Sequence, residues 1–284
     1  MFVNVLPSDD LPVVRAASRQ RAFGKVAFSA EKIDGLTRPL RIAESGSLRI
    51  RLPRGRDRQI EAVLVNTAGG IACGDRFEVD IAASAGAFVT AATPAAEKVY
   101  RSDGPVATMS VKLEVGENAR IDWLPQETIL FDRARLDRSL EANMAENASL
   151  SMFEAVVFGR AARQENVTEG YFSDRWRIRR GGKLVYADNF KLDGPIDALL
   201  RKRSVANGHR AIATFVHVAP DAVSRLEAAR ALLERASDCE MAASAWNGLL
   251  AVRFCAVTID ALRRAASPFL IGFRGAPLPR VWLS

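Results

Sequence analysis

The stretch Phe77-Glu-Val-Asp-Ile-Ala-Ala-Ser-Ala-Gly-Ala-Phe-Val-Thr90 decides the fold class of this chain. Apolar and polar residues alternate on both sides of a small turn, which is the pattern of two half-buried strands. A parallel α/β sheet would need a helix after each strand, and no helical pattern follows here. The stretch therefore predicts an all-β structure.

The same pattern recurs twice, in residues 111–122 (VKLEVGENARID) and 140–151 (LEANMAENASLS). The alanines that follow the three turns are Ala87, Ala119 and Ala148, which lie 32 and 29 residues apart. Units of this size stack as solenoid coils or as successive hairpins, because stacking buries a face that one unit cannot bury alone. We therefore expect a β-solenoid-like or two-layer β scaffold across residues 46–160, interrupted at most by a helix around residues 133–142.

The second half of the chain mixes both kinds of element. Residues 175–192 predict a hairpin that turns at Gly181-Gly182, and residues 248–257 predict another strand. Residues 220–237 predict an amphipathic helix, and a second helix begins near Thr258 and should end at Pro268. The fold class is thus mainly β with a few C-terminal helices, α+β overall. We interpret residues 1–284 as one domain, with a β-rich core at about 20–219 and a mixed region at about 220–284.

Composition indicates an ordinary globular protein of a reducing compartment. The 284 residues are 49% hydrophobic and 26% charged, and the cysteines Cys73, Cys239 and Cys255 form no zinc-binding pattern. The first residues show no basic region followed by a long apolar run, and no stretch has the length of a membrane span. We therefore expect a cytoplasmic protein with no membrane partner.

The net charge of +7 is concentrated in residues 1–60, which hold 12 Lys and Arg against 6 Asp and Glu. Such an end could bind an acidic protein or simply be a solvated surface. The basic residues are not interleaved with aromatic residues and no nucleic-acid-binding motif is present, so we expect no nucleic acid partner.

A glycine-rich loop lies at residues 64–75, LVNTAGGIACGD. Gly69, Gly70 and Gly74 permit left-handed or tightly curved backbone. The loop lacks the Lys-Ser/Thr ending of a phosphate-binding loop, and no helix follows it. It is either a structural turn or a loop that places Asn66, Cys73 and Asp75 around an opening.

Carboxylates embedded in apolar segments are the second notable feature. Glu127 and Asp132 lie in the segment WLPQETILFD, and Glu154 lies in SMFEAVVF. An idle buried charge is costly, so such acids either pair with cations or coordinate them. Two readings stay open: ion pairs with nearby Lys98, Arg101, Arg133 or Arg160, or a line of carboxylates facing a polar passage.

No catalytic constellation is recognisable. His209 follows Asn-Gly in a turn, and His217 lies in an apolar run, where a core histidine is the commoner explanation. We therefore expect a protein that is not an enzyme. The alternative is a β-solenoid carbohydrate-active enzyme, which would need paired carboxylates converging on a sugar-sized cleft.

Several strings, in order, resemble the urease accessory protein D family (UreD, also called UreH). They are Asn66-Thr-Ala-Gly-Gly-Ile71 with Gly74-Asp75, Thr93-Pro94, Lys98 with Tyr100-Arg101-Ser102, Trp123-Leu-Pro-Gln-Glu-Thr-Ile-Leu-Phe-Asp132, Phe158-Gly-Arg160 and Leu278-Pro-Arg-Val-Trp282. The resemblance covers about residues 20–284. One departure is Cys73, where the family often has a second glycine before the aspartate.

The resemblance implies a β-helix-like scaffold that binds the accessory proteins UreF and UreG and urease apoprotein. It also implies a polar tunnel through which Ni²⁺ passes toward the urease active site, with no tightly bound cofactor. A conduit must hold the ion weakly, and spaced carboxylates suit that task. The candidate nickel contacts are Asp75, Glu127, Asp132 and Glu154, and the candidate loop residues are Asn66, Gly69, Gly70 and Gly74.

Overall fold

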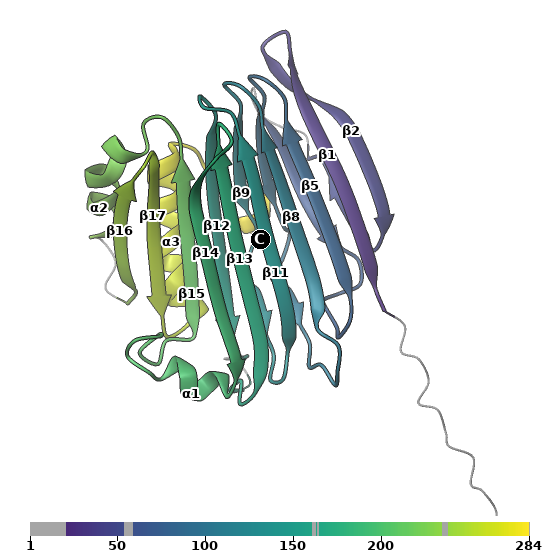
Figure 1. Ribbon diagram of the computed structural model, residues 1–284, viewed down its shortest axis with the longest axis vertical. Helices are drawn as coiled ribbons and strands as arrows, with labels where there is room; N and C mark the ends of the chain where they lie inside the picture. The colour runs from purple at the N-terminus through teal and green to yellow at the C-terminus, as the bar shows by residue number, and fades with distance from the viewer. Residues whose placement is uncertain (1–20, 54–58, 161–162, 164, 235–237, 284) are drawn as a thin grey trace, which may run out of the picture.

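Two stacked β-sheets form the body of the protein, and helices cover part of one outer face (Figure 1). The computed structural model describes residues 21–53, 59–160, 163, 165–234 and 238–283. Strands account for 54% of the structure and helices for 14%, so the expected mainly β class is confirmed. None of the helices among the described residues is long and apolar enough to cross a membrane.

The first sheet has seven strands in the order β14-β13-β11-β8-β5-β1-β2. Their bounds are β1 Phe23–Ile33, β2 Leu36–Gly46, β5 Arg76–Ala83, β8 Ala107–Val115, β11 Arg135–Met144, β13 Gly170–Arg180 and β14 Lys183–Gly194. Strands β5, β8, β11 and β13 run parallel to one another, and β1–β2 and β13–β14 are antiparallel hairpins. The predicted Gly181-Gly182 turn is confirmed, with both glycines at positive φ.

The second sheet has ten strands, eight of them in the order β16-β17-β15-β12-β9-β6-β4-β3; of the other two, β10 pairs with β12, and β7 pairs with β10. Their bounds are β3 Leu48–Arg51, β4 Ile60–Asn66, β6 Phe88–Ala92, β7 Glu97–Val99, β9 Arg120–Leu124, β10 Thr128–Leu130, β12 Ser149–Phe158, β15 Ala211–Val218, β16 Glu240–Trp246 and β17 Leu249–Ala256. Strands β4, β6, β9 and β12 are parallel neighbours.

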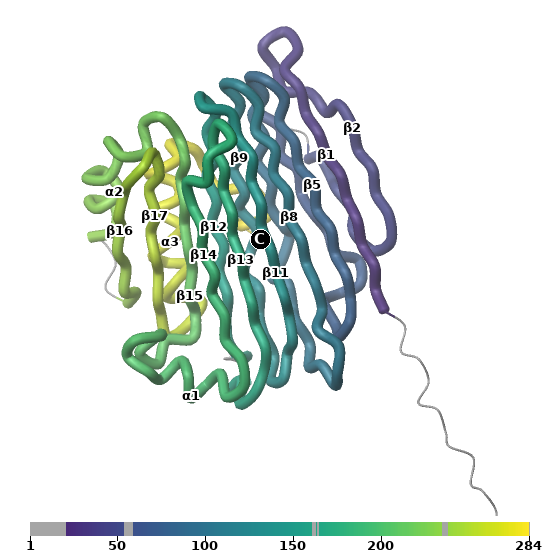
Figure 2. The backbone as a smooth tube through the Cα atoms, viewed as in Figure 1, coloured from purple at the N-terminus to yellow at the C-terminus, as the bar shows by residue number. Residues whose placement is uncertain are grey.

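The predicted repeat is the coil of a solenoid, and Figure 2 shows its successive turns side by side. Ile81 of β5 pairs with Leu113 of β8, which pairs with Ala142 of β11, so the register reproduces the 32- and 29-residue spacings. At each turn the chain passes from the first sheet to the second. The turn alanines are buried, and consecutive turns are hydrogen-bonded, as from the Arg120 amide to the Ala87 carbonyl at 2.9 Å.

Two apolar cores share the second sheet. One lies between the sheets, and the other lies between the second sheet and the helices α2 (Leu226–Leu233) and α3 (Ile259–Arg274). Strand β12 is buried on both faces, since Leu150 and Met152 face the first core while Phe153 and Ala155 face the second. This explains its nearly continuous apolar sequence, which is typical of strands covered on both sides. The remaining short helices are α1 (Ile196–Leu200), η2 (Val223–Arg225) and η3 (Arg280–Trp282).

Two local predictions were wrong. The segment 133–142, considered as a possible helix, belongs mostly to strand β11, because both neighbouring strands of the sheet satisfy its backbone. Helix α3 does not end at Pro268 but continues to Arg274, where Gly275 caps it at φ 64°. Pro268 is on the exposed side of α3, and the burial of Phe269, Leu270 and Phe273 beyond it outweighs the lost helical hydrogen bond.

Candidate functional site: a buried carboxylate cluster between the sheets

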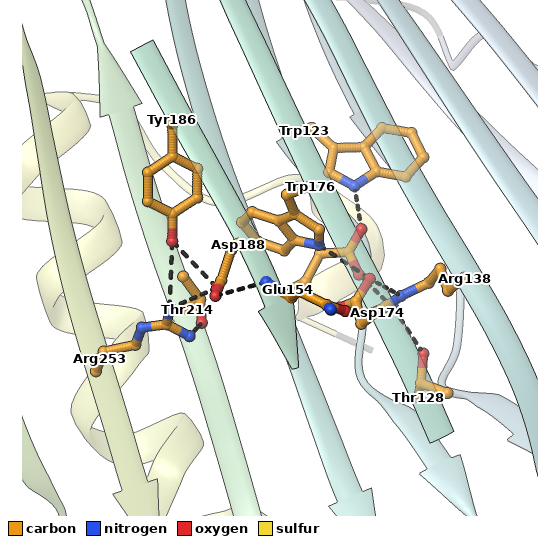
Figure 3. Close-up of polar contacts among 11 residues, drawn as sticks. Trp123, Thr128, Arg138, Glu154, Asp174, Trp176, Tyr186, Asp188, Thr214 and Arg253 are labelled. Atoms are coloured by element: carbon orange, nitrogen blue, oxygen red, sulfur yellow. Dashed lines mark hydrogen bonds and ion pairs between the residues drawn. The ribbon is translucent and has the colours of Figure 1, made fainter. Parts of the chain in front are cut away.

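A cluster of charged side chains lies inside the first core, between the two sheets (Figure 3). Glu154 of β12 points into this core because it lies on the same face of its strand as Met152 and Val156. Arg138 of β11 points into it from the other sheet, on the same face as Leu136 and Leu140. Asp174 of β13 completes the buried group. Glu154, Arg138 and Asp174 are 5%, 4% and 8% exposed, so water contributes little to their solvation.

One guanidinium serves two carboxylates. Arg138 donates from Nε to Asp174 Oδ1 at 3.1 Å and from Nη2 to Asp174 Oδ2 at 2.5 Å, and its Nη1 contacts Glu154 Oε2. Trp123 Nε1 donates to Glu154 Oε1 at 2.7 Å. Glu154 Oε2 receives no well-aligned hydrogen bond. The three charges leave one negative charge in excess, in a place where an unbalanced charge is costly.

The burial and the charge imbalance shift the pKa values of Glu154 and Arg138. Burial raises the pKa of Glu154, and the neighbouring Asp174 raises it further, while Arg138 works against both. The two carboxylates hold the pKa of Arg138 above its usual value. Arg138 therefore stays charged, and Glu154 takes up a proton more readily than an ordinary glutamate does.

A small cavity joins this group to the protein surface. It encloses about 30 Å³, roughly the space of one water molecule. In the wall of the cavity, Arg253 of β17 donates to Thr214 Oγ1 at 2.6 Å and to Asp188 Oδ2 at 2.5 Å. The Arg253 side chain is 46% exposed. Polar groups thus continue from the fully buried Arg138 to the edge of the sandwich.

The other candidate acids lie elsewhere. Glu127 is on the outer side of the second sheet, where Arg263 of α3 holds it with an Nη2–Oε2 distance of 2.8 Å. The same arginine donates to Gln126 Oε1 at 2.6 Å, and Gln126 Nε2 donates to the Val281 carbonyl at 2.8 Å. Glu127 and its neighbour therefore fasten the C-terminal helix and tail to the sheet.

Asp75 and Asp132 lie in loops before strands β5 and β11, at the end of the first sheet where these parallel strands begin. Asp75 accepts hydrogen bonds from the backbone amides of Ala22 and Ala72, each at 2.7 Å. Asp132 accepts from the amide and hydroxyl of Thr168 at 2.7 and 2.8 Å, and these bonds lower its pKa against the effect of partial burial. Both carboxylates organise backbone in the structure described here.

Hydrogen bonds hold the glycine-rich loop against strand β7 and the adjoining Tyr100. Ile71 donates to the Lys98 carbonyl at 2.7 Å, and Tyr100 Oη donates to the Gly69 carbonyl at 2.9 Å. Asn66 Nδ2 donates to the Gly70 carbonyl and to Glu97 Oε1, each at 3.2 Å. Burial raises the pKa of Glu97 to about 7.

Cys73 lies in the same loop and is buried. Its Sγ accepts a hydrogen bond from Arg21 Nη1 at 2.8 Å and donates one to Asp103 Oδ1 at 3.1 Å. Within the described residues, no group of three or more His, Cys, Asp or Glu side chains is arranged to hold a metal ion.

Ion pairing was correctly considered as one reading of the embedded acids, but only Asp132 uses a partner that was named. Its Oδ2 lies 3.8 Å from Arg133 Nε. Sequence reasoning missed Arg138, Asp174, Asp188 and Arg253, which are polar residues at core-facing positions of alternating strands. That parity was the one signal that could have found them. His217 is a buried histidine, as expected, and its Nδ1 lies 2.9 Å from Ser151 Oγ.

Comparison with known proteins gives one consistent result. The family described as UreD urease accessory protein matches residues 20–283. The protein named "Urease accessory protein UreD" of Xanthobacter autotrophicus is 56% identical over 266 residues, which cover 94% of this chain and 91% of that protein. The protein of the same name from Azorhizobium caulinodans is 53% identical over 94% of this chain and 98% of its own length.

Proposed function

Since this chain belongs to the UreD urease accessory protein family, we propose that it is a non-enzymatic scaffold that passes Ni²⁺ toward the urease active site. In this proposal it works in the cytoplasm with the UreF and UreG accessory proteins and docks on urease apoprotein. Nickel is cargo here and not a resident cofactor.

The observation that carries the nickel proposal is the buried excess charge at Glu154 and Asp174. Two carboxylates share one guanidinium, so the interior of the sandwich attracts a cation. Carboxylate oxygens are acceptable ligands for Ni²⁺ but weaker than a cysteine and histidine cage. A site that attracts the ion without enclosing it can also release it, as conduction through channels requires.

The path is proposed to run from Arg253 and Asp188 at the surface to Glu154 in the interior. Side chains must move for the ion to pass, because the free space is about 30 Å³. The same small volume argues against Glu154 and Asp174 as the paired carboxylates of a carbohydrate-active enzyme, since a sugar ring cannot enter it. Nickel contacts at Asp75, Glu127 and Asp132 remain predictions, and each of these carboxylates already accepts hydrogen bonds from the protein.

The test compares assembly with nickel delivery. Glu154→Gln removes the excess charge but leaves the Arg138–Asp174 pair and an oxygen for Trp123, so we expect the fold and the accessory complex to persist. The tagged chain is coexpressed with urease and the other accessory proteins. Retained partners are measured by pull-down, and nickel per urease by elemental analysis.

We expect nickel content to fall at least about tenfold in Glu154→Gln, the effect of losing a directly contacting charge. The matched control is Glu146→Gln, a 69% exposed acid on a coil turn, which should load urease normally. Full nickel loading with Glu154→Gln would refute the path, while failure of the unmutated chain to retain any urease protein would refute the scaffold.

A further inference from the structure

A second polar site lies on the surface, at the end of the first sheet where its parallel strands begin. Loops leading into β8, β11 and β13 form an open pocket of about 650 Å³. The side chains that define it are Arg101, Arg133 and Arg135, with Asp103 and Glu169 at its rim. Arg101 belongs to the Tyr-Arg-Ser string, and Arg133 follows the Phe-Asp string, so two of the family-like motifs meet here without a role in the nickel path.

Two of the three arginines in this pocket, Arg101 and Arg135, form no ion pair within the described residues, whereas Arg133 lies 3.8 Å from Asp132. Among the described residues, the Arg101 side chain makes no hydrogen bond or ion pair. Arg135 stacks on the ring of Tyr171 at 5.5 Å, and its Nε is buried with no hydrogen-bond acceptor. A buried N–H without an acceptor is rare and costly in native proteins. These guanidinium groups therefore present donors that a ligand could satisfy.

The rim of the pocket is held in place. Arg133 has a φ of 60°, which is unfavourable for a side chain of its size. The Arg133 amide donates to the Glu169 carbonyl at 2.8 Å, and the Ser102 amide donates to the Arg133 carbonyl at 2.9 Å. Asp132 binds the amides of Thr168 and Glu169 on the other side. Backbone strain maintained in this way is typical of binding sites, where it fixes a group before the ligand arrives.

The charged side chains of the pocket indicate which charge its ligand carries. Arg101 and Arg135 carry positive charges that no ion pair within the described residues neutralises, and one carboxylate can accept hydrogen bonds from both. A phosphate group carries about −1.5 to −2 and would bring a second charge toward the two rim acids. Arginine forks also match the planar geometry of a carboxylate. We propose that this pocket binds a glutamate or aspartate side chain on a segment of a partner protein.

This inference rests on the proposed scaffold function for the statement that the partner is a protein. The test uses the full tagged chain, coexpressed with the other proteins of urease maturation. The variant is Arg101→Gln with Arg135→Gln, chosen because neither side chain forms an ion pair within the described residues. The control is Arg38→Gln with Arg41→Gln, two exposed arginines of β2. Thermal melting of each variant checks the fold.

We expect the pocket variant to retain at least about tenfold less of one partner protein, with an unchanged melting temperature. The control should retain that partner fully. Arg101→Lys with Arg135→Lys should restore part of the retention, because it keeps the charge but not the fork. If Arg101→Gln with Arg135→Gln unfolds the chain, the double lysine variant and the single variant Arg101→Gln provide the same test. Each should retain less of the partner protein than the unmutated chain does.

Three results would overturn the inference. Equal retention by the folded pocket variant and the control would show that the pocket does not bind a partner, while leaving the scaffold function intact. Release of the partner from the unmutated chain by millimolar inorganic phosphate, with direct phosphate binding in calorimetry, would assign the pocket to phosphate. An unmutated chain that retains no partner would reject the scaffold function and this inference together.

Discussion

Arg274 donates from its Nε to Asp122 Oδ2 at 2.8 Å, and both side chains are almost completely withdrawn from solvent. Asp122 lies on β9, on the face covered by the C-terminal helix, and Arg274 is the last residue of that helix. Arg120 donates to the same carboxylate from Nε and Nη2, each at 2.9 Å. One buried aspartate thus joins the sheet to the end of α3.

Removing Asp122 should therefore be strongly destabilising. Asp122→Ala leaves the buried Arg274 without its counter-charge, and breaking a buried pair in this way costs about 3–5 kcal/mol. The free energy of unfolding from denaturant titration would measure this. Asp193→Ala removes an exposed acid that lies 3.7 Å from Lys191, and it should change stability by less than about 1 kcal/mol. Similar stabilities for the two variants would contradict the role of Asp122.

The glycine-rich loop should tolerate an added methyl group at one glycine and not at the next. Gly69 and Gly70 both have positive φ, at 77° and 144°. A Cβ at Gly70 would lie 2.5 Å from Tyr100 Cε2 and 2.8 Å from the Lys98 carbonyl, whereas a Cβ at Gly69 would meet nothing within 4 Å.

Gly69→Ala should therefore cost only the backbone strain, about 1–2 kcal/mol. Gly70→Ala should cost roughly 2–5 kcal/mol, because overpacking adds to that strain. Melting temperatures of the two variants provide the measurement. If Gly70→Ala melts no lower than Gly69→Ala, the close packing of the loop on β7 is not important for stability.

Glu97 should make the stability of the protein depend on pH. Its pKa is raised to about 7 by burial, from 4.5 for an ordinary glutamate. The folded chain therefore binds this proton more tightly than the unfolded chain. The stabilising contribution is fully present below about pH 4.5 and is lost as the pH rises to about 7, by up to about 3 kcal/mol, less what partial solvent contact removes.

Glu97→Gln should lack this dependence, since an amide does not titrate but can still accept from Asn66. The measurement is the difference in free energy of unfolding between the two proteins from pH 4.5 to 8. Parallel curves across this range would show that Glu97 titrates normally in the folded protein.

Pro268 offers a stabilising substitution. It lies on the exposed side of α3 and supplies no amide to the helix, so Pro268→Ala should raise the free energy of unfolding by about 1–3 kcal/mol. Ser267→Gly, at the neighbouring helical position, should lower it by about 0.5 kcal/mol, because glycine is the poorer helix former. A drop in stability with Pro268→Ala would mean that the helix depends on a bend at this residue.

Local sequence patterns were enough to predict the strands and their stacking. Alternation over residues 77–90 and the spacing of Ala87, Ala119 and Ala148 predicted the coils, because side-chain periodicity and turn chemistry act over a few residues. The strings around Asn66 and Glu127 also predicted the family correctly. Pro268 misled the same reasoning, since a helix boundary depends on the packing of residues beyond it as well as on the proline.

The partners of the charged residues were decided only by the tertiary structure. Glu127 pairs with Arg263, which is 136 positions away in the sequence, and Asp122 pairs with Arg274, which is 152 positions away. Arg138, Asp174 and Glu154 meet because β11, β13 and β12 bring them to the same layer between the sheets. The sequence by itself determines that a carboxylate occupies an apolar strand. Which cation neutralises it, and whether charge remains in excess, depends on strand neighbours that no local pattern encodes, because Coulomb interactions act through space and not along the chain.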